Sequence, residues 1–94
     1  MRKIEQLMVA AIKNKKDFHL DNTTVIIDTV NDKANVFLHN NHIGEYVYGW
    51  DCFMVNKSTL EQWPSNTTKS RLRALGCNVY TKKGVTYLND EPIN

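Results

Sequence analysis

The sequence predicts an α+β domain: an N-terminal helix packed on a three- to four-stranded antiparallel meander, then a short helix-turn-helix unit and a C-terminal β-hairpin. Three observations predict this class. An apolar stripe at helical spacing opens the chain, short strand-like runs separated by turn residues follow it, and capping patterns then mark two short helices. The 94 residues suffice for one domain, residues 1–94, and not for two.

Residues 2–13 carry the apolar stripe of the first helix. Five residues recur every three or four positions: Ile4, Leu7, Met8, Ala11 and Ile12. This spacing places them on one side of a helix, which we expect to cover one face of the sheet. The polar run at 14–17 ends the helix. Glu5 and Gln6 interrupt the apolar character, so the segment does not resemble a secretion signal.

The middle of the chain predicts the meander. Runs rich in β-branched and aromatic residues are expected to form strands at 23–30, 35–39 and 42–48, and residues 52–56 fit a fourth short strand. A tight turn is expected at Asn40-Asn41, because asparagine tolerates the positive φ that such turns require.

The last third predicts two short helices and a hairpin. Ser58 and Glu61 have the spacing of a capping box, which favours a helix over 58–63. After the break at Pro64-Ser65, Asn66 is positioned to cap a second helix. A hairpin with a basic tip is then expected from two further strands, and the tail after it is expected to fray. These strands are residues 78–81 and 85–88.

Positive charge is concentrated in this last third. From residue 62 to residue 89 the chain holds no acidic residue but five cations: Lys69, Arg71, Arg73, Lys82 and Lys83. The element order resembles the helix-turn-helix and wing of winged-helix DNA-binding domains, with TTKSRLRALG as the recognition helix and YTKKGVTYL as the wing. We therefore expect the cations to contact DNA or RNA, with Asn66 and Thr67 organising the helix start. The competing interpretation is an ordinary solvated helix face.

Three aromatic residues offer a different candidate surface. In the third strand Tyr46 and Tyr48 are expected on one face and Ile43 and Val47 on the other, with Trp50 just beyond. Core packing is the simplest role for such residues. If the tyrosine face is uncovered, it favours a protein–protein interface, including a homodimer formed through a sheet edge.

The residues give little support for catalysis or metal binding. His39 and His42 form one close pair, but Cys52 and Cys77 are 25 residues apart and do not complete a zinc signature, even with His19. Cys52 as a nucleophile has no orienting group in the pattern, and the acidic residues are dispersed. We therefore expect a non-enzymatic protein without a cofactor or metal.

Two further expectations concern location and origin. No run of about 18 apolar residues exists and the start does not resemble a secretion signal, which predicts a cytoplasmic protein without a membrane partner. Four segments resemble small uncharacterised proteins of tailed bacteriophages: RKIEQLMVAAIKNKKDF, DNTTVIID, VFLHNNHIG and NTTKSRLRALG. This resemblance implies an accessory role in the bacterial host cytoplasm and carries over no catalytic residue. With it, the alternative function is an inhibitor that binds a host or anti-phage defence protein through Tyr46, Tyr48 and Trp50.

Overall fold

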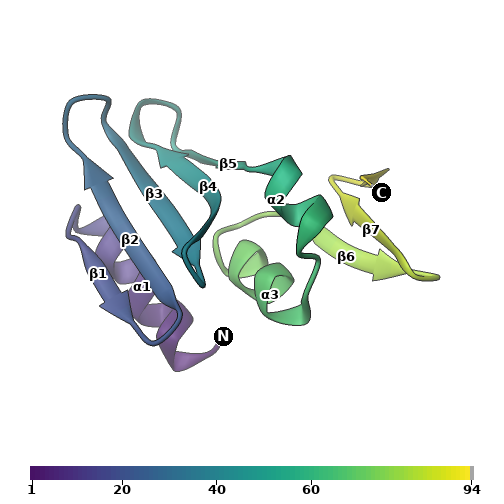
Figure 1. The fold of residues 1–94 in the computed structure, drawn as a ribbon. Coiled ribbons are helices and arrows are strands. Elements are labelled where there is room, and N and C mark those ends of the chain that lie inside the picture. Colours follow the sequence, from purple (N-terminus) through teal and green to yellow (C-terminus); the bar gives the residue numbers. More distant parts are fainter. Residues whose placement is uncertain (94) are drawn as a thin grey trace.

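The computed structural model describes residues 1–93 and contains three α-helices and two antiparallel sheets within them (Figure 1). Helix α1 (Lys3–Lys13) opens the chain. The larger sheet follows, with strands β1 (Phe18–Leu20), β2 (Thr23–Asp28), β3 (Lys33–Leu38), β4 (Asn41–Val47) and β5 (Cys52–Val55). A short 3-10 helix, η1 (Tyr48–Trp50), separates β4 from β5. Helices α2 (Lys57–Gln62) and α3 (Asn66–Ala74) lead to the smaller sheet of β6 (Val79–Lys82), β7 (Val85–Leu88) and β8 (Glu91–Pro92).

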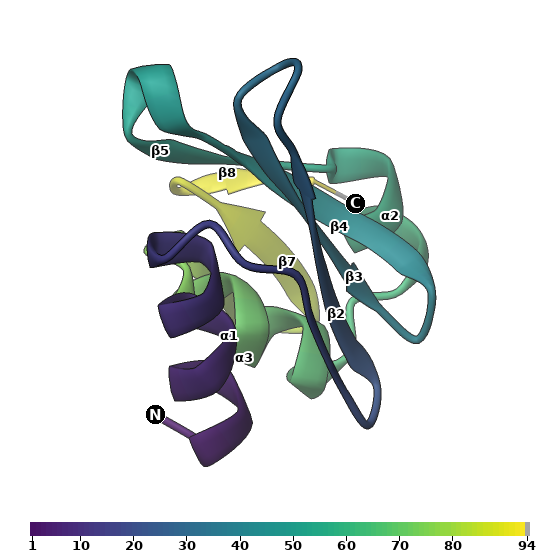
Figure 2. The same ribbon diagram turned by 90° about the vertical axis from the view of Figure 1, so that its left-hand side faces the viewer.

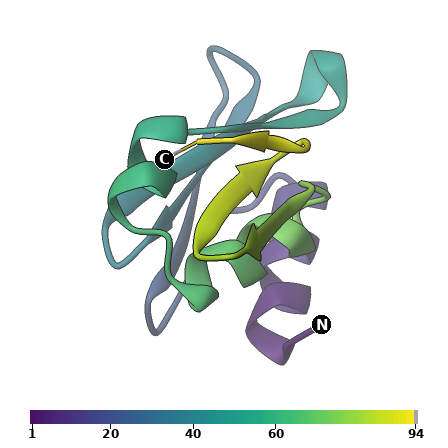
Figure 3. The same ribbon diagram turned by 90° about the vertical axis from the view of Figure 1, so that its right-hand side faces the viewer.

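Both sheets follow the order of their strands in the chain, β1–β2–β3–β4–β5 and β6–β7–β8. Helices α1 and α3 lie side by side on one face of the larger sheet (Figure 2). The smaller sheet lies on the far side of α3 from α1, in front of the larger sheet in Figure 3. The predicted N-terminal helix on an antiparallel sheet is therefore confirmed, but the sheets hold five and three strands instead of a short meander and a hairpin.

Two strands were not expected from the sequence. Strand β1 has three residues, which is too short to show an alternating pattern, and it pairs with β2 through a turn in which Asp21 has φ 52°. The prediction that the C-terminal tail frays is wrong for residues 91–92, which form β8. Asn89 and Asp90, with φ 53° and 67°, make the turn from β7 to β8. Turns whose residues have positive φ thus add one short strand to each sheet, outside the strand-like runs that the sequence shows.

The helix caps also differ from the expectation. Asn56 caps α2, because its side chain accepts a hydrogen bond from the Thr59 amide at 3.3 Å. Ser65, not Asn66, caps α3 and accepts from the Thr68 amide at 3.1 Å. The cap of α2 therefore lies two residues before the predicted Ser58, and the cap of α3 lies one residue before the predicted Asn66.

The β3–β4 turn lies one residue earlier than predicted. It consists of His39 and Asn40, whose φ angles of 51° and 65° are those of a type I′ turn. A bulge in β4 at Ile43, opposite Val36 and Phe37 of β3, shifts the register, so Ile43 and Gly44 are both buried. The expected simple alternation along this strand is therefore wrong, and Ile43 lies on the covered face together with Tyr46.

The core lies between the larger sheet, the two long helices and the smaller sheet. It is built from α1, both sheets and the helices α2 and α3. Its most buried apolar residues are Met8, Ile12, Val25, Ala34, Val36, Leu38, Ile43, Leu60, Leu72, Val79 and Leu88. One continuous core thus joins the three α-helices to both sheets.

Gly44 provides a test of the β4–β5 pairing. A Cβ atom at Gly44 would lie 2.5 Å from the Met54 carbonyl oxygen and from the Phe53 ring. We expect Gly44→Ala to lower the free energy of unfolding by about 1–3 kcal/mol, because overpacking displaces the neighbouring strand. Urea denaturation followed by circular dichroism measures this loss. Gly49→Ala is the matched control, since no atom lies within 4 Å of its added Cβ; equal losses in both variants would contradict this pairing geometry.

Candidate functional site

The central cation of the predicted nucleic-acid surface lies inside the protein. Arg71 is only 3% exposed, and its Nη1 donates to Glu5 Oε2 at 2.9 Å. Its Nε donates to Thr23 Oγ1 at 3.0 Å, and its Nη2 donates to Asn22 Oδ1 at 3.3 Å. Arg71 thus joins α3 to α1 and to the start of β2, and its guanidinium is not available to a phosphate.

Glu5 is the acidic partner in this buried network. Besides Arg71, its carboxylate accepts from Ser70 Oγ at 2.6 Å and from the Arg2 amide at 3.2 Å. Burial by itself would raise the pKa of Glu5, but the hydrogen bonds from Ser70, Arg2 and Arg71 outweigh it. The pKa of Glu5 is therefore lowered, and the residue stays ionised opposite Arg71.

The other two cations of α3 fasten the helix to the smaller sheet. Lys69 is 6% exposed, and its Nζ donates a hydrogen bond to Thr81 Oγ1. Arg73 lies on the exposed flank, where its Nη1 donates to the Val79 carbonyl oxygen at 3.0 Å. Helix α3 is thus held on several sides, unlike a recognition helix presented to DNA, and the winged-helix resemblance is not confirmed.

The remaining predicted nucleic-acid residues lie on the surface. Lys82 and Lys83 are exposed at the β6–β7 turn, Asn66 is exposed, and Thr67 is half-buried in the first turn of α3. The structure therefore brings the five cations to one unit of α3, β6 and β7, as predicted. It does not bring them to one solvent-facing platform, because three of them contact neighbouring protein groups.

The three predicted interface aromatics divide in a similar way. Tyr46 and Tyr48 pack against the core edge to face, with ring centroids 5.1 Å apart. The Tyr48 hydroxyl donates to the Ile12 carbonyl oxygen, and the Tyr46 hydroxyl donates to Asp51. Trp50 alone is largely exposed, at 71%. The tyrosine face is thus the covered face of the larger sheet, and Trp50 is left as an isolated surface aromatic.

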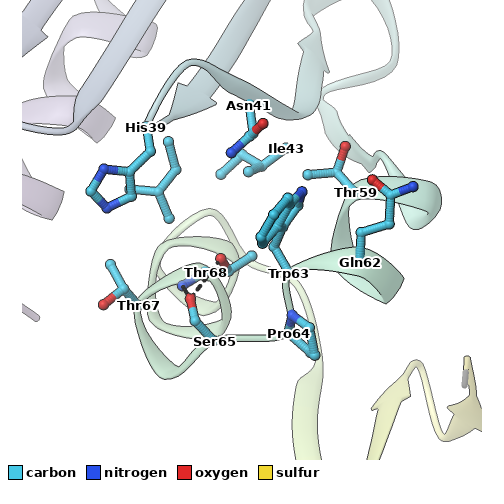
Figure 4. A pocket seen from close by; sticks show the side chains of 11 residues that line it. His39, Asn41, Ile43, Thr59, Gln62, Trp63, Pro64, Ser65, Thr67 and Thr68 are labelled. Carbon is cyan, nitrogen blue, oxygen red and sulfur yellow. Dashed lines mark hydrogen bonds between the residues drawn. The ribbon is translucent and has the colours of Figure 1, made fainter.

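A groove that the sequence analysis did not identify lies at the end of the larger sheet (Figure 4). It has a volume of about 690 Å³ and lies between the β3–β4 turn, α2 and the first turn of α3. Its lining residues are Leu38, His39, Asn41, Ile43, Thr59, Gln62, Trp63, Pro64, Ser65, Thr67 and Thr68. Lysine, arginine, aspartate and glutamate are all missing from this lining, which combines the Trp63 indole with apolar and neutral polar side chains and His39.

Trp63 is the largest side chain of the groove and is 55% exposed. Figure 4 shows its indole standing in the groove, with Asn41 of β4 above it and His39 of the β3–β4 turn at the far edge. Trp63 is the C-cap of α2, with φ −131°, and Pro64 follows it. Because proline disfavours helical geometry in the residue before it, the Trp63-Pro64 pair ends α2 and places the indole at the corner. In the sequence, a tryptophan directly before this helix-ending proline was the one feature that pointed to an exposed indole here.

Comparison with known protein families gives a match over the whole chain. The model of a family described as Kyanoviridae Gp96 protein matches residues 1–94. The chain belongs to this family. Membership confirms the resemblance to bacteriophage proteins and indicates a phage accessory protein. The chain matches no curated protein and no solved structure.

Among residues 1–93, His, Cys, Asp and Glu side chains form no group of three or more that could hold a metal ion. His42 uses both ring nitrogens within the sheet region, contacting Asn35 at 2.9 Å and Asn56 at 3.1 Å. Within the described part of the chain, no helix has the length and apolar character needed to cross a membrane.

The buried ion pair yields a stability prediction. We expect Arg71→Met to lower the free energy of unfolding by about 3–5 kcal/mol, because it leaves the Glu5 carboxylate buried without its cation. Lys15→Met is the control, since the Lys15–Asp32 pair is more than half exposed and contributes about 0–1 kcal/mol. Urea denaturation at pH 7 measures both, and losses of similar size would contradict the assigned role of Arg71.

The same carboxylate makes stability depend on pH. Since the pKa of Glu5 is lowered in the folded protein, its ionised form stabilises the fold fully above the ordinary value of 4.5. This stabilisation is lost as the pH falls through the lowered pKa. We expect the difference in unfolding free energy between the wild type and Glu5→Gln to be largest near neutral pH and to shrink below pH 4.5. A difference that stays constant between pH 7 and pH 3 would contradict this prediction.

Proposed function

We propose that this phage accessory protein acts in the host cytoplasm as a non-enzymatic binding protein whose partner is a host or anti-phage defence protein. The observation that carries the proposal is the exposed Trp63 indole in a groove that no lysine, arginine, aspartate or glutamate lines. Tryptophan is among the residues that dominate the energy of protein–protein interfaces when a partner covers them. The groove offers it together with polar groups that can pair with a polypeptide backbone.

The charge of the groove favours a protein partner over a polyanion. Nucleic-acid grooves combine stacking aromatics with cations that follow the phosphates. None of the residues lining the groove is lysine or arginine. The cations of α3, which were the first candidates for phosphate contacts, are engaged by Glu5, Thr81 and Val79.

The proposal includes no catalytic step. His39 is the one titratable side chain among the residues that line the groove. Nucleophilic and acid–base catalysis both need a second group that activates or orients the first. Cys77, which lies elsewhere, is half-buried, and burial raises its pKa to about 11. Its thiol is therefore protonated at neutral pH.

Nucleic acid is the second candidate, favoured by the exposed pair Lys82 and Lys83 at the β6–β7 tip. Two phosphate contacts by this tip would give a log–log salt slope of about −2 for DNA or RNA. Such binding would be weak and would not involve Trp63. Two experiments therefore distinguish a protein partner from nucleic acid: nuclease treatment, which removes nucleic acid, and substitution of Trp63, which alters only the groove.

Trp63→Ala tests the groove directly. The wild type and the variant are immobilised and exposed to nuclease-treated lysate of phage-infected host cells, and the captured proteins are quantified by mass spectrometry. We expect at least one host protein to be captured about 30-fold less by Trp63→Ala, which corresponds to about 2 kcal/mol for an interface hot spot. Trp50→Ala is the matched control, because it removes the other exposed indole and leaves the groove unchanged.

A second measurement uses the captured protein after purification. Trp50→Phe leaves Trp63 as the sole tryptophan, since the chain contains two. The partner should then shift the Trp63 emission and protect it from acrylamide quenching. Capture that survives Trp63→Ala, or capture lost equally in Trp50→Ala, would contradict the groove as the site. Capture of a second copy of this chain would replace the host partner with a homodimer.

A further inference from the structure

We infer that the exposed side of α1, with the loop after it, is a separate binding surface for the phosphate backbone of duplex DNA. This basic surface consists of Arg2, Lys3, Lys13 and Lys16. It lies on the opposite side of the molecule from the β6–β7 tip (Figure 1) and does not include the groove around Trp63. The inference therefore stands independently of the proposed protein partner.

The charge of residues 1–16 is strongly one-sided. The segment contains five cations, Arg2, Lys3, Lys13, Lys15 and Lys16, and all of them are exposed. Its one acidic residue, Glu5, is 2% exposed and is neutralised by Arg71. The ion pair thus removes the carboxylate from the surface of α1 and leaves positive charge facing solvent. A net charge of only +2 for the chain conceals this local excess.

Most other cations have protein partners. Lys15 pairs with Asp32 at 3.2 Å and lies over the Tyr48 ring, while Lys33 pairs with Glu45 at 3.1 Å. Within residues 1–93, the three ion pairs of the structure include none of the four cations of the basic surface. Asp17, the nearest acid in sequence to Lys16, accepts a hydrogen bond from the Ile27 amide. Phosphate groups would therefore meet cations that no carboxylate already occupies.

The geometry of α1 suits a duplex. Its buried side carries Glu5, Met8 and Ile12, so Lys3 and Lys13 lie on the solvent side at opposite ends of the helix. Ten residues separate these two lysines, or about 15 Å along a helix that rises about 1.5 Å per residue. The major groove of DNA is about 12 Å wide. A helix laid across it can therefore reach phosphates on both of its edges.

The expected affinity follows from the number of cations. Four phosphate contacts give a log–log salt slope of about −3.6. Raising the salt from 50 to 200 mM should then weaken binding about 150-fold. The contacts involve phosphates alone, so the affinity should vary little with base sequence.

The test measures fluorescence anisotropy of a labelled 20-base-pair DNA duplex of arbitrary sequence. The variant is Lys3→Glu/Lys13→Glu/Lys16→Glu. The matched control, Lys57→Glu/Lys82→Glu/Lys83→Glu, places the same charge change at the competing β6–β7 tip, so a loss confined to the control would assign DNA binding to that tip and overturn the inference. Both change the net charge from +2 by the same amount, but only the first alters the basic surface. We expect the first variant to lose at least 100-fold in affinity at 50 mM salt and the control to lose less than 5-fold.

A milder variant guards against misfolding. If circular dichroism shows that the glutamate variant does not fold, the corresponding triple glutamine variant decides, and its salt slope should fall from about −3.6 to about −0.9. Absence of binding at 50 mM salt, equal losses in the variant and the control, or tighter binding to the separated single strand would overturn the inference. Trp63→Ala should leave DNA binding unchanged, so failure of this inference and failure of the proposed function are distinguishable.

Discussion

The buried ion pair between Glu5 and Arg71 is the interaction on which the rest of the structure depends. It joins side chains 66 residues apart and fixes α1 against α3 and the start of β2. Removing two charges from water is costly, and the attraction offsets this cost only when every remaining hydrogen-bonding group has a partner. Ser70, Thr23 and Asn22 supply those partners. Within the described residues, no buried side-chain nitrogen or oxygen lacks a hydrogen bond.

The same pair determines which surfaces of the protein carry charge. Arg71 is withdrawn from α3, so the helix with the most suggestive sequence presents fewer free cations than its composition implies. Glu5 is withdrawn from the surface of α1, so the solvent side of this helix carries its lysines without an acidic residue. Arg71 of α3, which the sequence assigned to a binding site, thus stabilises the fold. The exposed positive charge lies on α1 instead. The groove around Trp63 differs from both helices, because no lysine, arginine, aspartate or glutamate lines it.

The predictability of these features depends on the range of the interactions that create them. The helix at the N-terminus and the main strands were predicted, because periodic patterns report burial over a few neighbouring residues. Strand β1 and strand β8, with three and two residues, contain too few positions for a pattern. The burial of Arg71 depends on Glu5 at the other end of the chain, which local composition cannot reveal. The exposure of Trp63 likewise depends on how α2, α3 and the β3–β4 turn meet in space.

The contact between Arg73 and Val79 has a consequence for aggregation. Successive carbonyls of a strand point to opposite sides, and the Asn78 carbonyl bonds to the Asn89 amide on the β7 side. The Val79 carbonyl therefore points outward, where an incoming chain would otherwise extend the sheet by backbone pairing. The guanidinium of Arg73 occupies that acceptor and leaves a fixed cation at the rim. A residue that the composition assigns to polyanion recognition thus occupies one of the backbone acceptors through which the open edge of the smaller sheet could pair with another chain.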